Sequence, residues 1–101
     1  MNPTPEQIAA MEARGWTWMA DLDTFSANVV IPVLYGDSHR LGAAVWWGQR
    51  NGWMANYGWS GASFSKNAGH PTPEAAADEA EAWLRGVLAG FRFPWLTVTT
   101  L

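Results

Sequence analysis

The sequence predicts an α+β fold, in which an antiparallel sheet of three to five strands packs on a C-terminal helix, with a short N-terminal helix. Three observations predict it. Strong helix-start signals open the segments 4–15 and 72–90. Much of the region between them alternates large apolar residues with small or polar ones at a period of two, which is typical of strands. An Asn-Gly pair at 51–52 predicts a tight hairpin turn.

The composition indicates one small folded domain, residues 1–101. Apolar residues make up 49% of the chain and charged residues 15%, which favours a packed core over disorder. The net charge is −3 and the basic residues are scattered, which argues against a nucleic-acid partner. Cysteine is absent, so disulfides and thiolate metal sites are excluded. Without a signal-peptide pattern or a membrane-length apolar run, we expect a cytoplasmic protein.

The first helix has clear signals for its first and last residues. Thr4 is placed to be the N-cap, Pro5 the first helical residue, and Gln7 the partner of Thr4 in a capping box. Gly15 is placed to end the helix. Its apolar stripe is narrow, so we expect this helix to lie on a larger element.

The second helix has start and end signals of the same kind. Thr72 caps it, Pro73 begins it, and Gly90 is placed to end it. Glu81 and Arg85 are spaced for an ion pair one turn apart. An apolar stripe at helical spacing, rich in alanine, predicts close packing on the sheet. It comprises Ala76, Ala80, Trp83, Val87 and Leu88.

The strands are expected in the segments 16–22, 28–35, 41–49 and 53–60, and the tail after residue 90 is a candidate for another. Residues 23–27 are expected to form a turn and 61–71 a loop. Pro32 cannot donate a ladder hydrogen bond, so its strand is an edge or carries a bulge.

The expected hairpin turn sets a register. With Asn51 and Gly52 as a two-residue turn, Trp46 lies opposite Tyr57. One hairpin face then carries most of the aromatic bulk, and we assign that face to the core against the second helix. The expected core residues are Trp16, Trp18, Val29, Ile31, Val33, Trp46, Tyr57 and Trp59.

The opposite face then combines polar residues with an apolar patch around Trp47. A patch of this kind on a small protein often marks a contact with another protein or with a second copy. The candidate partner-binding residues are Met19, Val45, Trp47, Arg50, Met54 and Asn56. The alternative is that the tail or a loop of this chain covers the patch.

No group of residues predicts catalysis, a cofactor or a bound metal. Asp37, Ser38 and His39 are consecutive, whereas a catalytic triad must converge from separate places, so a turn is expected there. Asp21 and Asp23 are interpreted as a solvated strand end. His70 precedes a proline and is expected in a loop. We therefore expect a protein that is not an enzyme.

A different possibility is an aromatic platform for a nucleotide, sugar or other small ligand. Trp47 and Trp53 are the candidate rings, with Arg50 near enough to meet a phosphate. Single-strand binders combine such rings with a basic groove, and this sequence has none.

The stretch "GHPTPEAAADEAEAWL", 69–84, which follows a short β-meander, resembles the end of HicB-type antitoxin domains. The Leu-Pro-Gly turn of that family is absent, and no DNA-binding segment follows. The resemblance implies a βββα unit that binds a protein, as a HicB-like antitoxin or small regulator. The whole chain also resembles, in style, short phage accessory proteins such as anti-CRISPR proteins. We therefore expect a non-enzymatic protein-binding module, of the kind a phage uses to inhibit a bacterial defence system.

Overall fold

The fold is α+β, as predicted. The computed structural model describes residues 2–31, 39–59, 62–64 and 69–89. Its elements in chain order are α1 (Pro5–Ala13), β1 (Thr17–Met19), β2 (Thr24–Ile31), β3 (His39–Gly48), β4 (Gly52–Trp59), β5 (Ala62–Phe64) and α2 (Pro73–Leu88).

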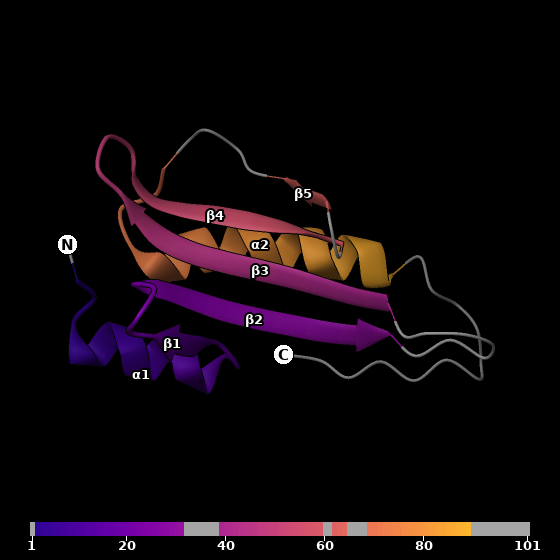
Figure 1. Ribbon diagram of the computed structural model, residues 1–101, viewed down its shortest axis with the longest axis horizontal. Coiled ribbons are helices and arrows are strands. Elements are labelled where there is room, and N and C mark those ends of the chain that lie inside the picture. The colour runs from indigo at the N-terminus through magenta and orange to yellow at the C-terminus, as the bar shows by residue number, and fades with distance from the viewer. Residues whose placement is uncertain (1, 32–38, 60–61, 65–68, 90–101) are drawn as a thin grey trace.

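The five strands form one sheet in chain order, and each strand is antiparallel to the next. Helix α2 packs on β3 and β4, while α1 contacts α2 and β1. Figure 1 shows α2 behind the two central strands and α1 beside β1. Both helices therefore pack on the same side of the sheet, and the core lies between the helices and the sheet.

The N-terminal helix is capped as the sequence predicts. The Thr4 hydroxyl accepts a hydrogen bond from the Gln7 backbone N–H at 3.1 Å, and the Gln7 side chain accepts one from the Thr4 N–H at 2.9 Å. Helix α1 ends at Ala13, and Gly15 follows with a φ of 93°. Met11 is fully buried, so α1 contributes one large side chain to the core.

Helix α2 also begins as predicted, with Thr72 accepting a hydrogen bond from the Ala75 N–H at 3.1 Å. Small side chains on its inner side let it approach the sheet closely. Its buried residues are Pro73, Ala76, Ala77, Ala80, Glu81 and Leu84. Three larger residues, Trp83, Val87 and Leu88, are half-buried against the core. The ring of Trp83 lies 5.3 Å from that of Tyr57 on β4.

The β3–β4 hairpin has a different register from the one predicted. Gly48 pairs with Gly52, so the loop has three residues, 49–51, and Trp46 lies opposite Met54 instead of Tyr57. The predicted type I′ turn needs a positive φ at both of its central residues. Gly52 has a positive φ of 89°, whereas Asn51 does not have a positive φ.

This difference of three residues reverses the faces of β3, because an odd shift moves every side chain to the other side of the sheet. Val45 is fully buried, and Trp47 packs on the core with its ring 5.6 Å from the buried Trp53. Trp46 is on the opposite side. The predictions of Trp46 in the core and of Val45 and Trp47 outside it were therefore wrong. The assignment of Tyr57 on β4 to the core is confirmed, with 6% exposure, and Trp53 on the same strand is also buried, with 2% exposure.

The first strands are also shorter and differently placed than expected. Strand β1 stops at Met19, because a turn closed by hydrogen bonds from Leu22 and Asp23 to Met19 and Ala20 follows it. Asp23 has a φ of 48° there, and Leu22, the last residue of the segment 16–22 expected to be a strand, is 61% exposed. Strand β2 then begins at Thr24, inside the segment 23–27 that was expected to be a turn.

Two of the expected core tryptophans precede that turn. Trp16 is 2% exposed, which confirms its place in the core. Trp18 is half-buried, and its ring lies 4.7 Å from that of the fully buried Phe25. The side chains of Val29, Ile31 and Trp59, and all of Val33, lie outside the part of the chain that the structure describes.

The segment 61–71, expected to be a loop, contains β5 and a second contact with the sheet. Trp53 and His70 exchange two backbone hydrogen bonds of 2.8 Å. The chain comes so close here that a Cβ at Gly52 would lie 2.6 Å from the His70 carbonyl oxygen. Gly69 likewise has no room for a side chain beside Asn51. This contact holds the hairpin turn against the start of α2.

Candidate protein-binding face

The side of the sheet opposite the two helices is the candidate binding site, and we call it the outer face. Alternation from the buried residues Phe25, Val45 and Ala55 identifies which side chains it carries. Its residues with described side chains or glycine positions are Thr17, Met19, Thr24, Ser26, Asn28, Gly42, Ala44, Trp46, Gly48, Met54, Asn56 and Gly58.

Trp46 is the largest side chain on the outer face. It lies between Thr24 on β2 and Met54 on β4 in the pairing of the strands. It is half-buried, and unlike Trp47 it is not among the residues packed on the core. A half-buried indole on the side away from the core has apolar surface left to offer to a partner.

Met54 lies beside Trp46 and over a glycine. A Cβ added at Gly48 would lie 2.8 Å from the Met54 Cγ, so the methionine occupies the space that a larger residue would fill. This position reduces its exposure to 9%. Trp46 and Met54 therefore form one apolar cluster at one end of the outer face.

The pairs that follow Trp46–Met54 toward the start of β3 have small side chains or none among the described residues. Gly42 pairs with Gly58 there, and Ala44 and Asn56 form the next pair toward the apolar cluster. The Asn28 amide oxygen would be 3.5 Å from a Cβ at Gly42, so it borders this shallow area.

No side chain that the structure describes on the outer face is charged; Arg40 pairs with Val30 at the next outer-face position beyond Gly42, and its side chain lies outside the description. The ionisable side chains lie elsewhere: Asp21 and Asp23 are exposed in the β1–β2 turn, and Arg50 is exposed in the hairpin loop. Eight more acidic and basic residues with described side chains are in or next to the helices, at Glu6, Glu12, Arg14, Glu74, Asp78, Glu79, Glu81 and Arg85, and His70 precedes α2. An uncharged face with an aromatic centre and Ser, Thr and Asn around it has the composition of the inner part of a protein interface.

The candidate partner-binding residues predicted from the sequence divide into three groups. Met19, Met54 and Asn56 lie on the outer face as expected. Val45 and Trp47 belong to the core side, and Arg50 is in the loop between the strands. The residue that sequence reasoning missed is Trp46. The alternation of Leu41, Ala43 and Val45, all buried, is the signal that could have placed it correctly.

Trp47 and Trp53 do not form an accessible platform for a flat ligand. Their ring planes are inclined at 70°, edge to face, and Trp53 is 2% exposed. Their rings are used for packing, which removes the structural basis for a base or sugar site on these two residues.

A polar cluster is buried between α2 and β4. The Glu79 side chain is 8% exposed, and its Oε1 lies 2.8 Å from Nε2 of His70. Burial, a hydrogen bond to Glu79 and the negative charge of Glu79 all raise the pKa of the Tyr57 hydroxyl. The second Glu79 oxygen is buried without a hydrogen-bond partner. His70, expected to be a loop residue, is thus tied to α2 as well as to β4.

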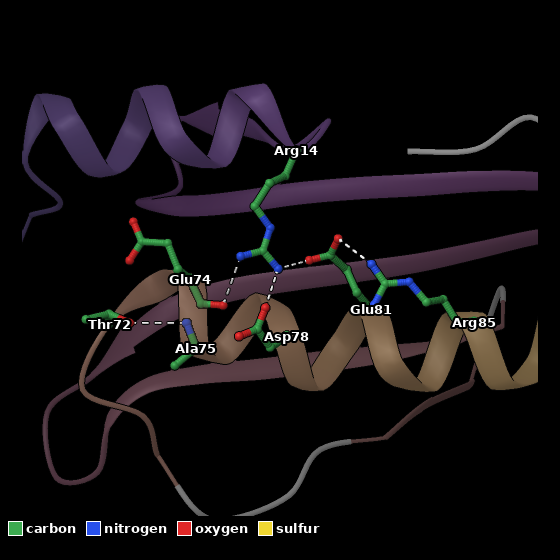
Figure 2. A network of polar contacts seen from close by, with 7 residues as sticks. All are labelled: Arg14, Thr72, Glu74, Ala75, Asp78, Glu81 and Arg85. Atoms are coloured by element: carbon green, nitrogen blue, oxygen red, sulfur yellow. Dashed lines mark hydrogen bonds and ion pairs between the residues drawn. The ribbon is translucent and has the colours of Figure 1, made fainter.

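A second charged network joins α1 to α2 (Figure 2). Arg14 forms ion pairs with Glu81 and with Asp78, the latter at 2.6 Å, and also donates to the Glu74 carbonyl oxygen at 3.4 Å. Burial opposes the charge of Arg14, but the two carboxylates outweigh that effect and raise its pKa. The predicted Glu81–Arg85 pair is confirmed at 3.7 Å. The Arg14 contacts hold the two helices together, whereas the Glu81–Arg85 pair lies within α2.

The residues considered for chemistry do not assemble into a site. Asp37, Ser38 and the side chain of His39 lie outside the described part of the chain. Among the residues that the structure describes, no three His, Asp or Glu side chains are grouped to hold a metal ion. No described helix is long and apolar enough to cross a membrane.

The chain matches no protein-family model, and comparisons with curated proteins and with solved structures likewise find no match.

Proposed function

We propose that this protein acts by binding another protein through the outer face, with Trp46 as the central contact. The observation that carries the proposal is the position of Trp46: half-buried, on the side of the sheet away from α1 and α2, among uncharged small and polar residues. Tryptophan is enriched among the residues that contribute most to protein–protein affinity.

The positions of the ionisable groups favour binding over catalysis, because these groups join elements of the fold to one another. The His70–Glu79 contact and the Arg14 network connect elements of the fold, and the outer face offers no described acid, base or nucleophile beyond hydroxyl groups. A partner surface of matching chemistry is flat and largely uncharged, with apolar groups that cover the indole.

The kind of partner is proposed from the likeness to short phage accessory proteins. On this proposal the chain is an inhibitor of a bacterial defence system and covers a surface of a host complex. An aromatic contact at the centre of the described part of the outer face suits an inhibitor that blocks a site by occupying it.

The experiment is a capture from bacterial lysate with three immobilised proteins: the wild type, Trp46→Ala and Leu22→Ala. Leu22 is the matched control, since it is 61% exposed but lies in the β1–β2 turn. Recovered proteins and small ligands are identified by mass spectrometry. We expect a protein that is retained by the wild type and Leu22→Ala and lost with Trp46→Ala.

A plating assay tests the kind of partner. Expression of the wild type in a host with an active defence system should raise the plating efficiency of a sensitive phage, and Trp46→Ala should abolish the effect. A protein partner retained equally by Trp46→Ala, or a small ligand alone, would contradict the proposed use of the outer face.

A further inference from the structure

The Asn51–Gly52 pair at the β3–β4 hairpin has a chemical property besides its role in the turn. We propose that Asn51 is a site of spontaneous deamidation, and that the contact of Gly69 and His70 with the hairpin loop controls the rate. The proposal concerns a covalent modification of the chain and does not depend on what the protein binds. It follows from the residue after Asn51 and from the packing around the peptide bond that joins the two.

Deamidation begins with a ring closure in the main chain. The backbone nitrogen of Gly52 forms a bond to the side-chain carbon Cγ of Asn51, and the Cγ–Nδ2 bond breaks. The amide nitrogen leaves as ammonia and takes with it the proton that the Gly52 nitrogen loses. Water then opens the resulting succinimide at one of its two carbonyl carbons, so the residue becomes aspartate or isoaspartate. Water is the only other reactant, and nothing is oxidised or reduced.

Asn51 is better suited to this reaction than the other asparagines in the described part of the chain. It is exposed in the hairpin loop, and Gly52 has no Cβ to obstruct the approach of its nitrogen. Asn28 and Asn56 lie within β2 and β4, and each precedes a residue with a branched or aromatic side chain. Asn2 precedes a proline, which has no amide proton to lose.

The packing of the loop restrains the ring closure. To bring the Gly52 nitrogen to Cγ, the peptide bond between the two residues must turn about the Cα–C bond of Asn51. A Cβ at Gly69 would overlap the Asn51 carbonyl group, and a Cβ at Gly52 would lie 2.6 Å from the His70 carbonyl oxygen. Two backbone hydrogen bonds of 2.8 Å between Trp53 and His70 hold the chain in this position. The ring therefore closes only when the contact opens.

The two products differ in their effect on the fold. Aspartate leaves the main chain unchanged and adds one negative charge to an exposed loop. Isoaspartate directs the main chain through the side-chain carbons, which adds a carbon atom to the backbone of the short loop between Gly48 and Gly52. Asn51 lies so close to Gly69 that no side chain fits between them. Isoaspartate at this position therefore breaks the contact with His70 and destabilises the hairpin.

Peptide mapping by mass spectrometry tests the site and its control by the fold. The wild type is incubated at mildly alkaline pH in two states, folded and unfolded in guanidinium chloride. In the unfolded chain we expect Asn51 to be deamidated faster than Asn28 and Asn56. Unfolding should accelerate the reaction at Asn51 by about tenfold or more, because the folded chain must first open locally.

The contact itself is tested by Gly69→Ala, which crowds the Asn51 carbonyl and leaves the Asn51–Gly52 pair unchanged. This variant should deamidate faster than the folded wild type. Gly86→Ala is the matched control, since its Cβ meets nothing within 4 Å, and it should keep the wild-type rate. Circular dichroism reports whether each variant is folded. If Gly69→Ala does not fold, the comparison of folded and unfolded wild type decides the question.

The effect on the fold is measured on the isoaspartate form, separated from the unmodified chain by anion exchange. It should melt at a lower temperature than the wild type. Asn51→Asp carries the added charge without the lengthened backbone and should melt close to the wild type. Four results would overturn the proposal: equal rates in folded and unfolded wild type, slower reaction at Asn51 than at Asn28 or Asn56 in the unfolded chain, a folded Gly69→Ala with the wild-type rate, or an isoaspartate form as stable as Asn51→Asp.

Discussion

Trp47 on β3 lies directly opposite Trp53 on β4, and their rings meet edge to face with centroids 5.6 Å apart. The pair closes the core at the end of the sheet nearest the hairpin loop. Its neighbour Trp46, one residue earlier, contributes to the other face. The two adjacent tryptophans thus lie on opposite faces of the sheet.

The first prediction concerns this division. Trp47→Ala should lower the free energy of unfolding by about 2–4 kcal/mol, because it removes a large side chain packed on the core. Trp46→Ala should cost about 1 kcal/mol or less. Urea denaturation followed by circular dichroism at low protein concentration, where association adds no stability, gives both values. A larger loss in Trp46→Ala than in Trp47→Ala would mean that the faces of β3 are assigned wrongly here.

The second prediction concerns the contact between the hairpin turn and His70. Gly52→Ala should destabilise the protein by about 2 kcal/mol or more, since it combines a positive φ with a Cβ 2.6 Å from the His70 carbonyl oxygen. Gly86→Ala is the matched control. Gly86 lies within α2 with nothing within 4 Å of an added Cβ, so the change should stabilise by about 0.5–1 kcal/mol. Thermal melts should move in opposite directions, and equal shifts would refute the close approach at Gly52.

The third prediction concerns the ion pairs between the helices. Arg14→Ala leaves the carboxylate of Glu81, whose side chain is 9% exposed, without its main partner. We expect a loss of about 2 kcal/mol, reduced from the value for a fully buried pair because Arg14 itself is 28% exposed. Arg85→Ala removes the 75% exposed partner of the same carboxylate and should cost at most about 0.5 kcal/mol. Chemical denaturation of both variants tests the difference, and equal losses would place the stabilisation outside the Arg14 contacts.

The fourth prediction concerns alkaline pH. The pKa of Tyr57 is raised in the folded state, so above the usual tyrosine value of about 10 the unfolded chain loses this proton more readily than the folded chain. The stabilising contribution is therefore complete below that pH and declines as pH rises through it. Tyr57→Phe should show a shallower alkaline loss of stability than the wild type. In Tyr35→Phe, where Tyr57 is the remaining tyrosine, absorbance at the phenolate band should titrate above the usual value.

The elements that could be predicted from the sequence depend on contacts within a few residues. The Thr4–Gln7 box and the Thr72 cap are bonds between residues three apart, and they form wherever the helix forms. The fold class and the β4 face follow from a period of two and from alanine spacing in α2, which are also local patterns. The outer face as a candidate site could be anticipated in the same way, through Met19, Met54 and Asn56.

The tertiary structure alone decided which side of the sheet receives each residue of β3. The hairpin register depends on the turn at 49–51, and Gly69 and His70, which press against that turn, are far along the chain. A shift of register by an odd number of residues moves every side chain of a strand to the other face of the sheet. The contact between Trp53 and His70, 17 residues further along the chain, accompanies the register that places Trp47 in the core and Trp46 outside it. Leu22 became exposed for a related reason: the β1–β2 turn at Asp23 ended β1 before its apolar pattern did. Local sequence sets the pattern of a strand, whereas long-range packing sets the face that the pattern presents.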